Sequence, residues 1–159
     1  MWISPDRART LLSNAIENKQ LTAFDIVFPK QDVNRHWTAD VSISHLEGYD
    51  WLRGNSTIHT LGCRDFSFSY DPKHEHSLLL PQFLATFPNL RTLSLSSTFY
   101  GEKELAQVVR EILKVTHLKT IYTYLDDKDL RCLEKLARSK GTELIWGSEP
   151  RPWPIPLKQ

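Results

Sequence analysis

The residues best able to bind a metal ion lie together in one polar stretch. His74, Glu75 and His76 are consecutive, and Asp71 precedes them by three positions. Two histidines at positions i and i+2 can reach one ion only from a strand or a bent loop, and zinc needs a third or fourth ligand. Neither an H-E-x-x-H motif nor a pair of C-x-x-C motifs accompanies them. We therefore interpret the stretch as a solvated loop before a helix, and expect no metal or other cofactor.

The candidate nucleophiles lack the sequence context that catalysis needs. Ser94, Ser96 and Ser97 lie outside any G-x-S-x-G motif. Cys63 occupies an apolar place and Cys132 falls within a helical pattern, so we expect two reduced, packed thiols. The six glycines are scattered singly, which leaves no glycine-rich phosphate loop. We expect a protein without catalytic residues.

The composition is that of one ordinary domain or one short repeat array. Of the 159 residues 40% are hydrophobic, and 20 Lys and Arg against 19 Asp and Glu leave a net charge of +1. Phosphate binding needs a surplus of clustered basic residues, so we expect no nucleic acid and no anionic membrane as partner. No apolar run is long enough for a transmembrane helix or a secretory signal, so we expect an intracellular protein, cytoplasmic or nuclear.

A repeated pattern of apolar residues is clearest in segment 89–98. Leu90, Leu93 and Leu95 fill the apolar places of the leucine-rich template L-x-x-L-x-L-x-x-N/C, and Thr98 stands where Asn or Cys is usual. Leu93 and Leu95 are two residues apart, so a strand directs both to one face. Leu90 enters the same core from the preceding turn.

The same phase fits four other segments, although their spacing is irregular. The repeat starts at residues 21, 58, 90, 118 and 141, so the intervals shorten from 37 to 32, 28 and 23 residues. Thr123 weakens the third apolar place of the fourth segment. The pattern predicts strands near residues 21–28, 58–66, 90–97, 118–124 and 142–146.

A helix is predicted before each strand, from apolar residues at helical spacing. Ser4 and Pro5 fit the start of the first helix, and Ser44 with Glu47 fits a capping box at the start of the second. Asp126 or Asp127 fits the start of the fifth, and Gly141 its left-handed end. The expected apolar stripes are Ala8, Leu11, Leu12, Ala15 and Ile16; Leu46, Tyr49 and Leu52; Leu80, Phe83, Leu84 and Phe87; Leu105, Val108, Val109, Ile112 and Leu113; and Leu130, Leu133, Leu136 and Ala137.

The order helix then strand, five times over, predicts an α/β protein. We expect residues 1–147 to form one short, irregular leucine-rich-repeat-like solenoid, with a parallel sheet on one face and helices on the other. The alternative is a compact three-layer α/β domain with the same order of elements.

Segment 87–97, FPNLRTLSLSS, resembles the leucine-rich repeats of eukaryotic F-box proteins, especially fungal ones. The closing segment 141–147, GTELIWG, is similar to the way such arrays end. The resemblance covers roughly residues 5–147 and implies the part of a ubiquitin-ligase adaptor that holds the substrate. The F-box itself is not found, so binding to the ligase scaffold would require an F-box supplied elsewhere.

Residues that alternate with the core leucines are predicted to line the concave strand face. Arg64, Tyr122 and Tyr124 are of types enriched in interface hot spots. The expected partner-binding residues are Arg64, Thr92, Ser94, Ser96, Thr120, Tyr122 and Tyr124, with Thr60, Thr92 and Thr120 stacked in one ladder. A solvated face that follows strand propensity is the other interpretation of the same residues.

Two alternative functions stay open at this point. A small α/β enzyme would place its site at the carboxyl ends of the strands, near Arg64, Asp65, Thr98, Asp126 and Asp127. A fragment of a longer array would instead stack its uncapped edge against missing repeats or another copy.

The tail, residues 148–159, has prolines at positions 150, 152, 154 and 156. It cannot continue a helix or a central strand, and an extended polyproline conformation suits it. We expect it to cap the last repeat with Trp153 and Ile155, rather than serve as a free proline-rich ligand.

A capping tail has a consequence for stability. Deletion of residues 149–159 should lower the melting temperature, because the core of the last repeat would lose its cover. Thermal unfolding followed by circular dichroism measures this, and an unchanged melting temperature would favour the ligand interpretation.

Overall fold

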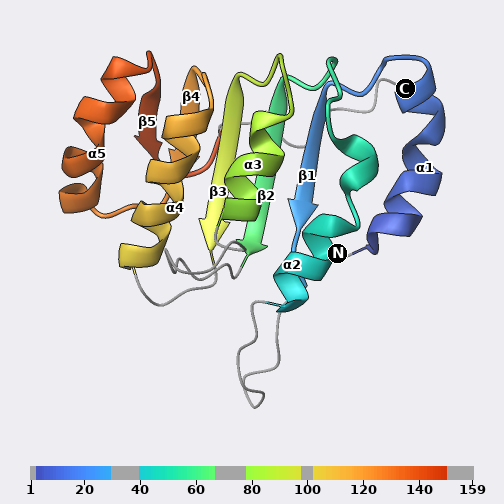
Figure 1. The fold of residues 1–159 in the computed structure, drawn as a ribbon, viewed down its shortest axis with the longest axis horizontal. Coiled ribbons are helices and arrows are strands. Elements are labelled where there is room, and N and C mark those ends of the chain that lie inside the picture. Colours follow the sequence, from blue (N-terminus) through green and yellow to red (C-terminus); the bar gives the residue numbers. More distant parts are fainter. Residues whose placement is uncertain (1–2, 30–39, 67–77, 98–101, 150–159) are drawn as a thin grey trace, which may run out of the picture.

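The computed structural model describes residues 3–29, 40–66, 78–97 and 102–149. Within these residues helices and strands alternate along the chain (Figure 1). The elements are α1 (Pro5–Glu17), β1 (Ala23–Val27), α2 (Asp40–Glu47), the 3-10 helix η1 (Asp50–Leu52), β2 (Thr60–Phe66), α3 (Leu79–Ala85), β3 (Thr92–Ser97), α4 (Glu102–Val115), β4 (Thr120–Thr123), α5 (Asp127–Ser139) and β5 (Glu143–Trp146). The predicted metal stretch around His74, Thr98 and residues 150–159 of the tail lie outside the described residues.

The five strands form one parallel sheet in the order β1-β2-β3-β4-β5. The helices lie on the near side of this sheet in Figure 1 and the strands behind them. Crossovers between parallel strands are right-handed, so consecutive strand order brings every helix to the same face. The predicted α/β class with a parallel sheet is therefore confirmed, and the described residues leave the other sheet face without helices.

The register of the sheet follows the predicted phase. Leu93 lies opposite Leu61 and Ile121, and the series extends to Phe24 and Leu144. The strands nevertheless begin later than predicted, at residues 23, 60, 92, 120 and 143. The residue in the first apolar place reaches the core from the turn instead, as the burial of Leu21, Ile58, Leu90 and Leu118 shows.

A repeated pair of hydrogen bonds joins the strand starts from β1 through β4, and a single bond from Glu143 N–H to the Lys119 carbonyl joins β4 to β5. The His59 carbonyl accepts from Arg91 N–H at 2.8 Å and from Thr92 N–H at 3.0 Å. The carbonyl of Arg91 accepts in the same way from Lys119 and Thr120, at 2.8 and 3.1 Å. These bonds set the register of each strand against its neighbour before the regular ladder begins.

The helices bury most of the stripe residues that their sequences predict, but the prediction is wrong for Leu11 of α1, which is 65% exposed, and for one helix start. All five apolar residues of the α4 stripe are buried, and Asp126 caps α5 by accepting from Asp129 N–H at 2.7 Å. Ser4 likewise accepts from Arg7 N–H at the start of α1. The predicted start of α2 at Ser44 is wrong: Ser44 lies inside the helix, because packing of Ile43 against the core extends it back to Asp40.

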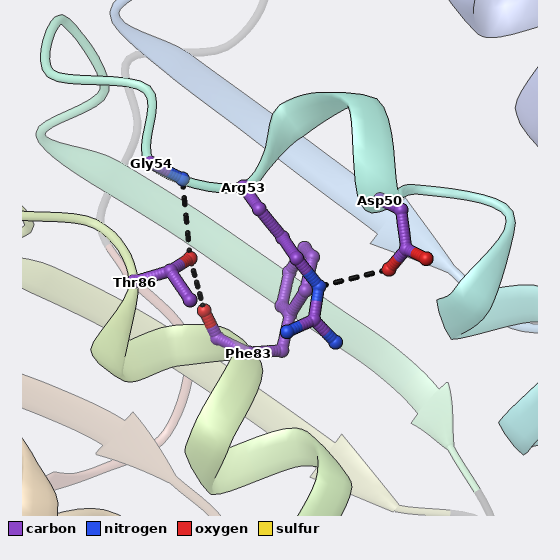
Figure 2. Close-up of polar contacts among 5 residues, drawn as sticks. All are labelled: Asp50, Arg53, Gly54, Phe83 and Thr86. Carbon is purple, nitrogen blue, oxygen red and sulfur yellow. Dashed lines mark hydrogen bonds and ion pairs between the residues drawn. The ribbon is translucent and has the colours of Figure 1, made fainter.

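Neighbouring repeats also touch on the helix side, where η1 meets α3 (Figure 2). The Arg53 guanidinium lies 5.5 Å from the centre of the Phe83 ring, and Asp50 holds it with an ion pair of 2.8 Å. Gly54 N–H donates to Thr86 Oγ1 at 3.3 Å, and that hydroxyl donates to the Phe83 carbonyl at 2.7 Å. The cation–π contact and the hydrogen bonds fix the spacing of the two repeats.

Thr123 occupies an apolar place in the core. It is fully buried in register with Leu95 and Trp146, and its hydroxyl has no hydrogen-bond partner among the described residues. A buried hydroxyl without a partner destabilises the folded state because its hydration is lost without replacement. Thr142 is also buried, but its hydroxyl donates to the Leu118 carbonyl at 2.6 Å.

These two threonines provide a matched pair of substitutions. Thr123→Val should raise the free energy of unfolding by about 1 kcal/mol, whereas Thr142→Val should lower it by about 1 kcal/mol. Both substitutions replace a hydroxyl with a methyl group, so the two variants differ in whether a hydrogen bond of that hydroxyl is lost. Urea unfolding of both variants measures the difference, and equal effects would contradict the assignment of the unpaired hydroxyl.

Candidate binding site on the open face of the sheet

A hollow of about 110 Å³ lies on the sheet face opposite the helices. Its lining crosses the sheet from the end of β5 through β4 and β3 to β2. The lining residues are Arg64, Ser94, Leu95, Ser96, Tyr122, Tyr124, Gly147 and Ser148. Five of the seven residues predicted to bind a partner therefore meet in one place.

The other two predicted residues lie nearer the strand starts. Thr92 is in register with Thr60 and Thr120, so the threonine ladder forms as predicted. Neither Thr92 nor Thr120 lines the hollow. The ladder therefore borders the hollow along the strands and does not form its wall.

A β-bulge in β2 sets the position of Arg64. Cys63 pairs with Leu95 and Phe66 with Ser97, so two residues of β2 lie opposite Ser96 alone. Asp65 takes a left-handed conformation with φ of 63° at this point. Its backbone N–H donates to Ser96 Oγ at 3.4 Å. Bulges redirect side chains, and this one brings Arg64 to the same hollow as Ser96.

Asp25 on β1 lies over Gly62 and beside Arg64. Its Oδ2 is 3.7 Å from Arg64 Nη2, and the Arg64 side chain is 49% exposed. A Cβ atom at position 62 would lie 2.2 Å from Asp25 Oδ1, so only glycine leaves room for this carboxylate. The exposed pair contributes little to stability, but it holds the guanidinium at one end of the hollow.

Hydroxyl groups and aromatic rings form the rest of the wall. The Ser94 hydroxyl is secluded from solvent and has no hydrogen-bond partner among the described residues. Tyr124 OH forms a hydrogen bond with Ser148 Oγ. The Tyr124 ring meets Trp146 edge to face, with ring centres 5.4 Å apart. Trp146 is 64% exposed, which leaves a large aromatic surface beside the hollow.

The lining offers hydrogen-bond donors and carries no carboxylate. The described groups with shifted pKa values lie in the core on the helix side instead. Burial lowers the pKa of His45, raises the pKa of Tyr49 to about 12, and raises that of the Cys63 thiol, with the nearby Asp25 charge adding to the last. The hollow therefore suits recognition of acceptor groups, and the described residues bring no pair of perturbed acid and base into it.

A larger groove of about 750 Å³ lies at the end of the sheet. All its lining residues belong to the last helix and strand or to their connection: Asp127, Leu130, Arg131, Glu134, Ala137, Arg138, Gly141, Thr142, Glu143 and Leu144. Of the residues expected for an enzyme, Arg64 lines the hollow and Asp127 the groove, while Asp126 caps α5. The structure thus does not gather these residues into one site.

Metal and thiol chemistry find little support in the described part of the chain. No group of three or more His, Cys, Asp and Glu residues there could hold an ion. Both cysteines are free, and Cys63 is buried as predicted. The expectation of a packed Cys132 is wrong, because Leu133 takes the core-facing position on α5 and leaves Cys132 exposed. None of the described helices combines the length and hydropathy that a membrane crossing requires.

The predicted binding residues did not include four that the structure adds to the site. Gly147 and Ser148 line the hollow from beyond the last strand, Leu95 lines it from β3, and Asp25 reaches Arg64 from β1. The only signal for Gly147 was its place directly after an apolar strand, where a turn is expected. Comparisons with protein-family models, curated proteins and solved structures found no match to this chain.

A double-mutant cycle tests whether Asp25 occupies the space that a side chain at position 62 would need. Gly62→Ala should lower the free energy of unfolding by about 1 kcal/mol, because the new methyl group displaces the carboxylate. In an Asp25→Ala background the same change should be neutral or stabilising, because alanine suits a strand better than glycine. Urea unfolding of the four proteins measures the coupling, and additive effects would show that the two side chains do not compete for space.

Proposed function

We propose that the chain is a non-catalytic interaction module that binds a protein partner on the open strand face, centred on the hollow. The observation that carries the proposal is the meeting of Arg64, Ser94, Ser96, Tyr122 and Tyr124 on a face that the described residues leave without helices. We further propose that its architecture is a short leucine-rich-repeat-like solenoid.

The repeated contacts support the solenoid interpretation. The paired hydrogen bonds at the strand starts recur from one unit to the next, and each strand pairs only with its neighbours in the chain. The Thr57 hydroxyl donates to the Leu21 carbonyl, and the Thr142 hydroxyl donates to the carbonyl of Leu118, which holds the same place as Leu21 three units later. Nearest-neighbour stacking of like units is the defining property of repeat proteins.

The chemistry of the hollow supports a protein partner. Arginine and tyrosine are enriched among residues that dominate binding energy. A wall rich in donors fits the backbone carbonyls and acidic side chains of a polypeptide.

The resemblance of segment 87–97 to F-box repeats supports a role in substrate recognition. On this basis we propose a cytoplasmic or nuclear protein that holds a substrate, with the ligase scaffold recruited only through an F-box supplied elsewhere. The experiment below is designed to identify the protein that binds to the open face.

Affinity purification from native cell extract, read by mass spectrometry, tests the proposal. The triple variant Arg64→Ala/Tyr122→Ala/Tyr124→Ala should lose partners that the unaltered chain retains. The control variant Arg9→Ala/Leu11→Ala/Asn14→Ala removes one charge and two larger side chains from exposed positions of α1 and should retain them. Circular dichroism establishes that all three proteins are equally folded.

Cross-linking of a retained complex then locates the contact. Cross-links should join the partner to strands β2, β3 and β4 on the open side. Partners that bind both variants equally, or cross-links confined to the helices, would overturn the assignment of the open face as the binding site.

A further inference from the structure

We propose that two copies of this chain pair through the outer edge of β5, with the two β5 strands antiparallel about a twofold axis. β5 and α5 form one end of the structure, opposite the end formed by α1 and β1 (Figure 1), and no described strand lies beyond β5. A second copy fits this edge because the apolar groups, the backbone hydrogen bonds and the charges each match when the edge meets itself. The dimer does not depend on the proposed function of the open face.

The apolar core is covered at the β1 end of the sheet and uncovered at the β5 end. One row of residues crosses all five strands in register: Ile26, Cys63, Leu95, Thr123 and Trp146. Ile26 is fully buried, whereas Trp146 is 64% exposed. Leu144, two residues earlier on β5, packs against the core but is only partly buried. The β5 end therefore exposes apolar surface whose burial favours association.

The backbone of β5 directs two residues toward its outer edge. The N–H groups of Glu143 and Gly147 donate to carbonyls on the β4 side, at 2.8 and 3.0 Å. Because hydrogen-bonding groups alternate in direction along a strand, those of Leu144 and Trp146 point away from β4. An antiparallel strand can form a hydrogen-bonded pair with each of these two residues.

A twofold axis beside Ile145 satisfies both residues at once. Leu144 of one copy then lies opposite Trp146 of the second copy, and the axis repeats this pair, which gives four backbone hydrogen bonds. The pairing of an aliphatic with an aromatic side chain stabilises adjacent strands. Glu143 lies opposite Gly147 of the second copy, so two carboxylates do not face each other along the strands.

The groove at the end of the sheet carries charges that suit the same orientation. Its charged lining residues are Asp127, Arg131, Glu134, Arg138 and Glu143. The first turn of α5 is acidic, with Asp127 and Asp129, and its last turn contains Arg138. Antiparallel pairing brings the start of one α5 toward the end of the other, so Arg138 approaches Asp127 of the second copy. Arg138 also pairs with Glu134 of its own helix at 2.7 Å, but its side chain is 77% exposed and can accept a second carboxylate.

Head-to-tail stacking, with β5 of one copy beside β1 of the next, is the competing arrangement. It would place α5 parallel to α1, and the first turns of both helices are acidic, with Asp127 and Asp129 in α5 and Asp6 in α1. It would also bury less apolar surface, because Ile26 is already covered at the β1 end. Contacts of this kind do not close and produce longer oligomers. The charges and the burial therefore favour the closed dimer.

Analytical ultracentrifugation of the 159-residue chain over a concentration series tests the dimer. Trp146→Lys should raise the Kd about tenfold or more, because pairing would place a lysine against Leu144 in each half of the interface. Leu11→Lys is the matched control, since Leu11 on α1 is 65% exposed, and it should leave the Kd unchanged. A chain that stays monomeric up to roughly 1 mM, or that forms oligomers longer than a dimer, overturns the proposal. Equal dimerisation of the Trp146→Lys variant overturns it as well.

Two charge reversals test the antiparallel orientation. Asp127→Arg and Arg138→Glu each bring like charges together twice in their own dimers, and each should raise the Kd about fivefold. A mixture of the two variants, one of them labelled with a fluorophore at its amino terminus, has opposite charges at both contacts. The mixed dimer should therefore form at lower concentration than either variant alone. Equal affinity of the mixed dimer and the two single-variant dimers would refute this orientation.

Hydrogen exchange, measured by nuclear magnetic resonance at low and high concentration, locates the contact. The amides of Leu144 and Trp146 should gain protection as the dimer forms, because they point to the outer edge. The amide of Ile145, which points toward β4, should change much less. Protection of Leu144 and Trp146 that is the same at every concentration would mean that the chain covers its own edge, and the dimer proposal would then be wrong.

Discussion

The rest of the structure depends on one constraint, the shared register of five parallel strands. The paired hydrogen bonds from the carbonyls of His59 and Arg91 align each strand start with the next. Because side chains alternate along a strand, this alignment sends one set of residues to the helices and the other to the open face throughout the sheet. A slip of one residue in any strand would exchange leucines of the core for the polar groups of the hollow.

The open face gains its shape where the regular register is broken. The bulge in β2 places both Arg64 and Asp65 opposite Ser96, and Gly62 leaves space for the Asp25 carboxylate. Without the bulge and the glycine, the side chains of the open face would stack in regular rows across the strands. The hollow therefore arises from local irregularity within an otherwise regular parallel sheet.

On the helix side of the sheet, one core position is filled by a polar residue, and helix–strand units of different length pack against one another. Thr123 occupies a place that leucine fills in β3, and its hydroxyl is buried without a partner in the described structure. The cation–π contact of Arg53 with Phe83 and the hydrogen bonds of Thr86 join adjacent units whose lengths differ. The shortening of the repeats is thus absorbed in the connections and helices, while the strands keep one spacing.

The sequence by itself determined the α/β class, the order of elements, most of the apolar stripe residues and the face on which the strand residues lie, but not the exposure of Leu11. Those properties follow from local periodicity, because alternation along a strand and helical spacing are fixed by backbone geometry. The helix start at Asp40, the exposure of Cys132, the β2 bulge and the joining of Asp25 and Ser148 to the hollow were decided by tertiary structure. Each depends on contacts between segments distant in the chain, which no local pattern encodes.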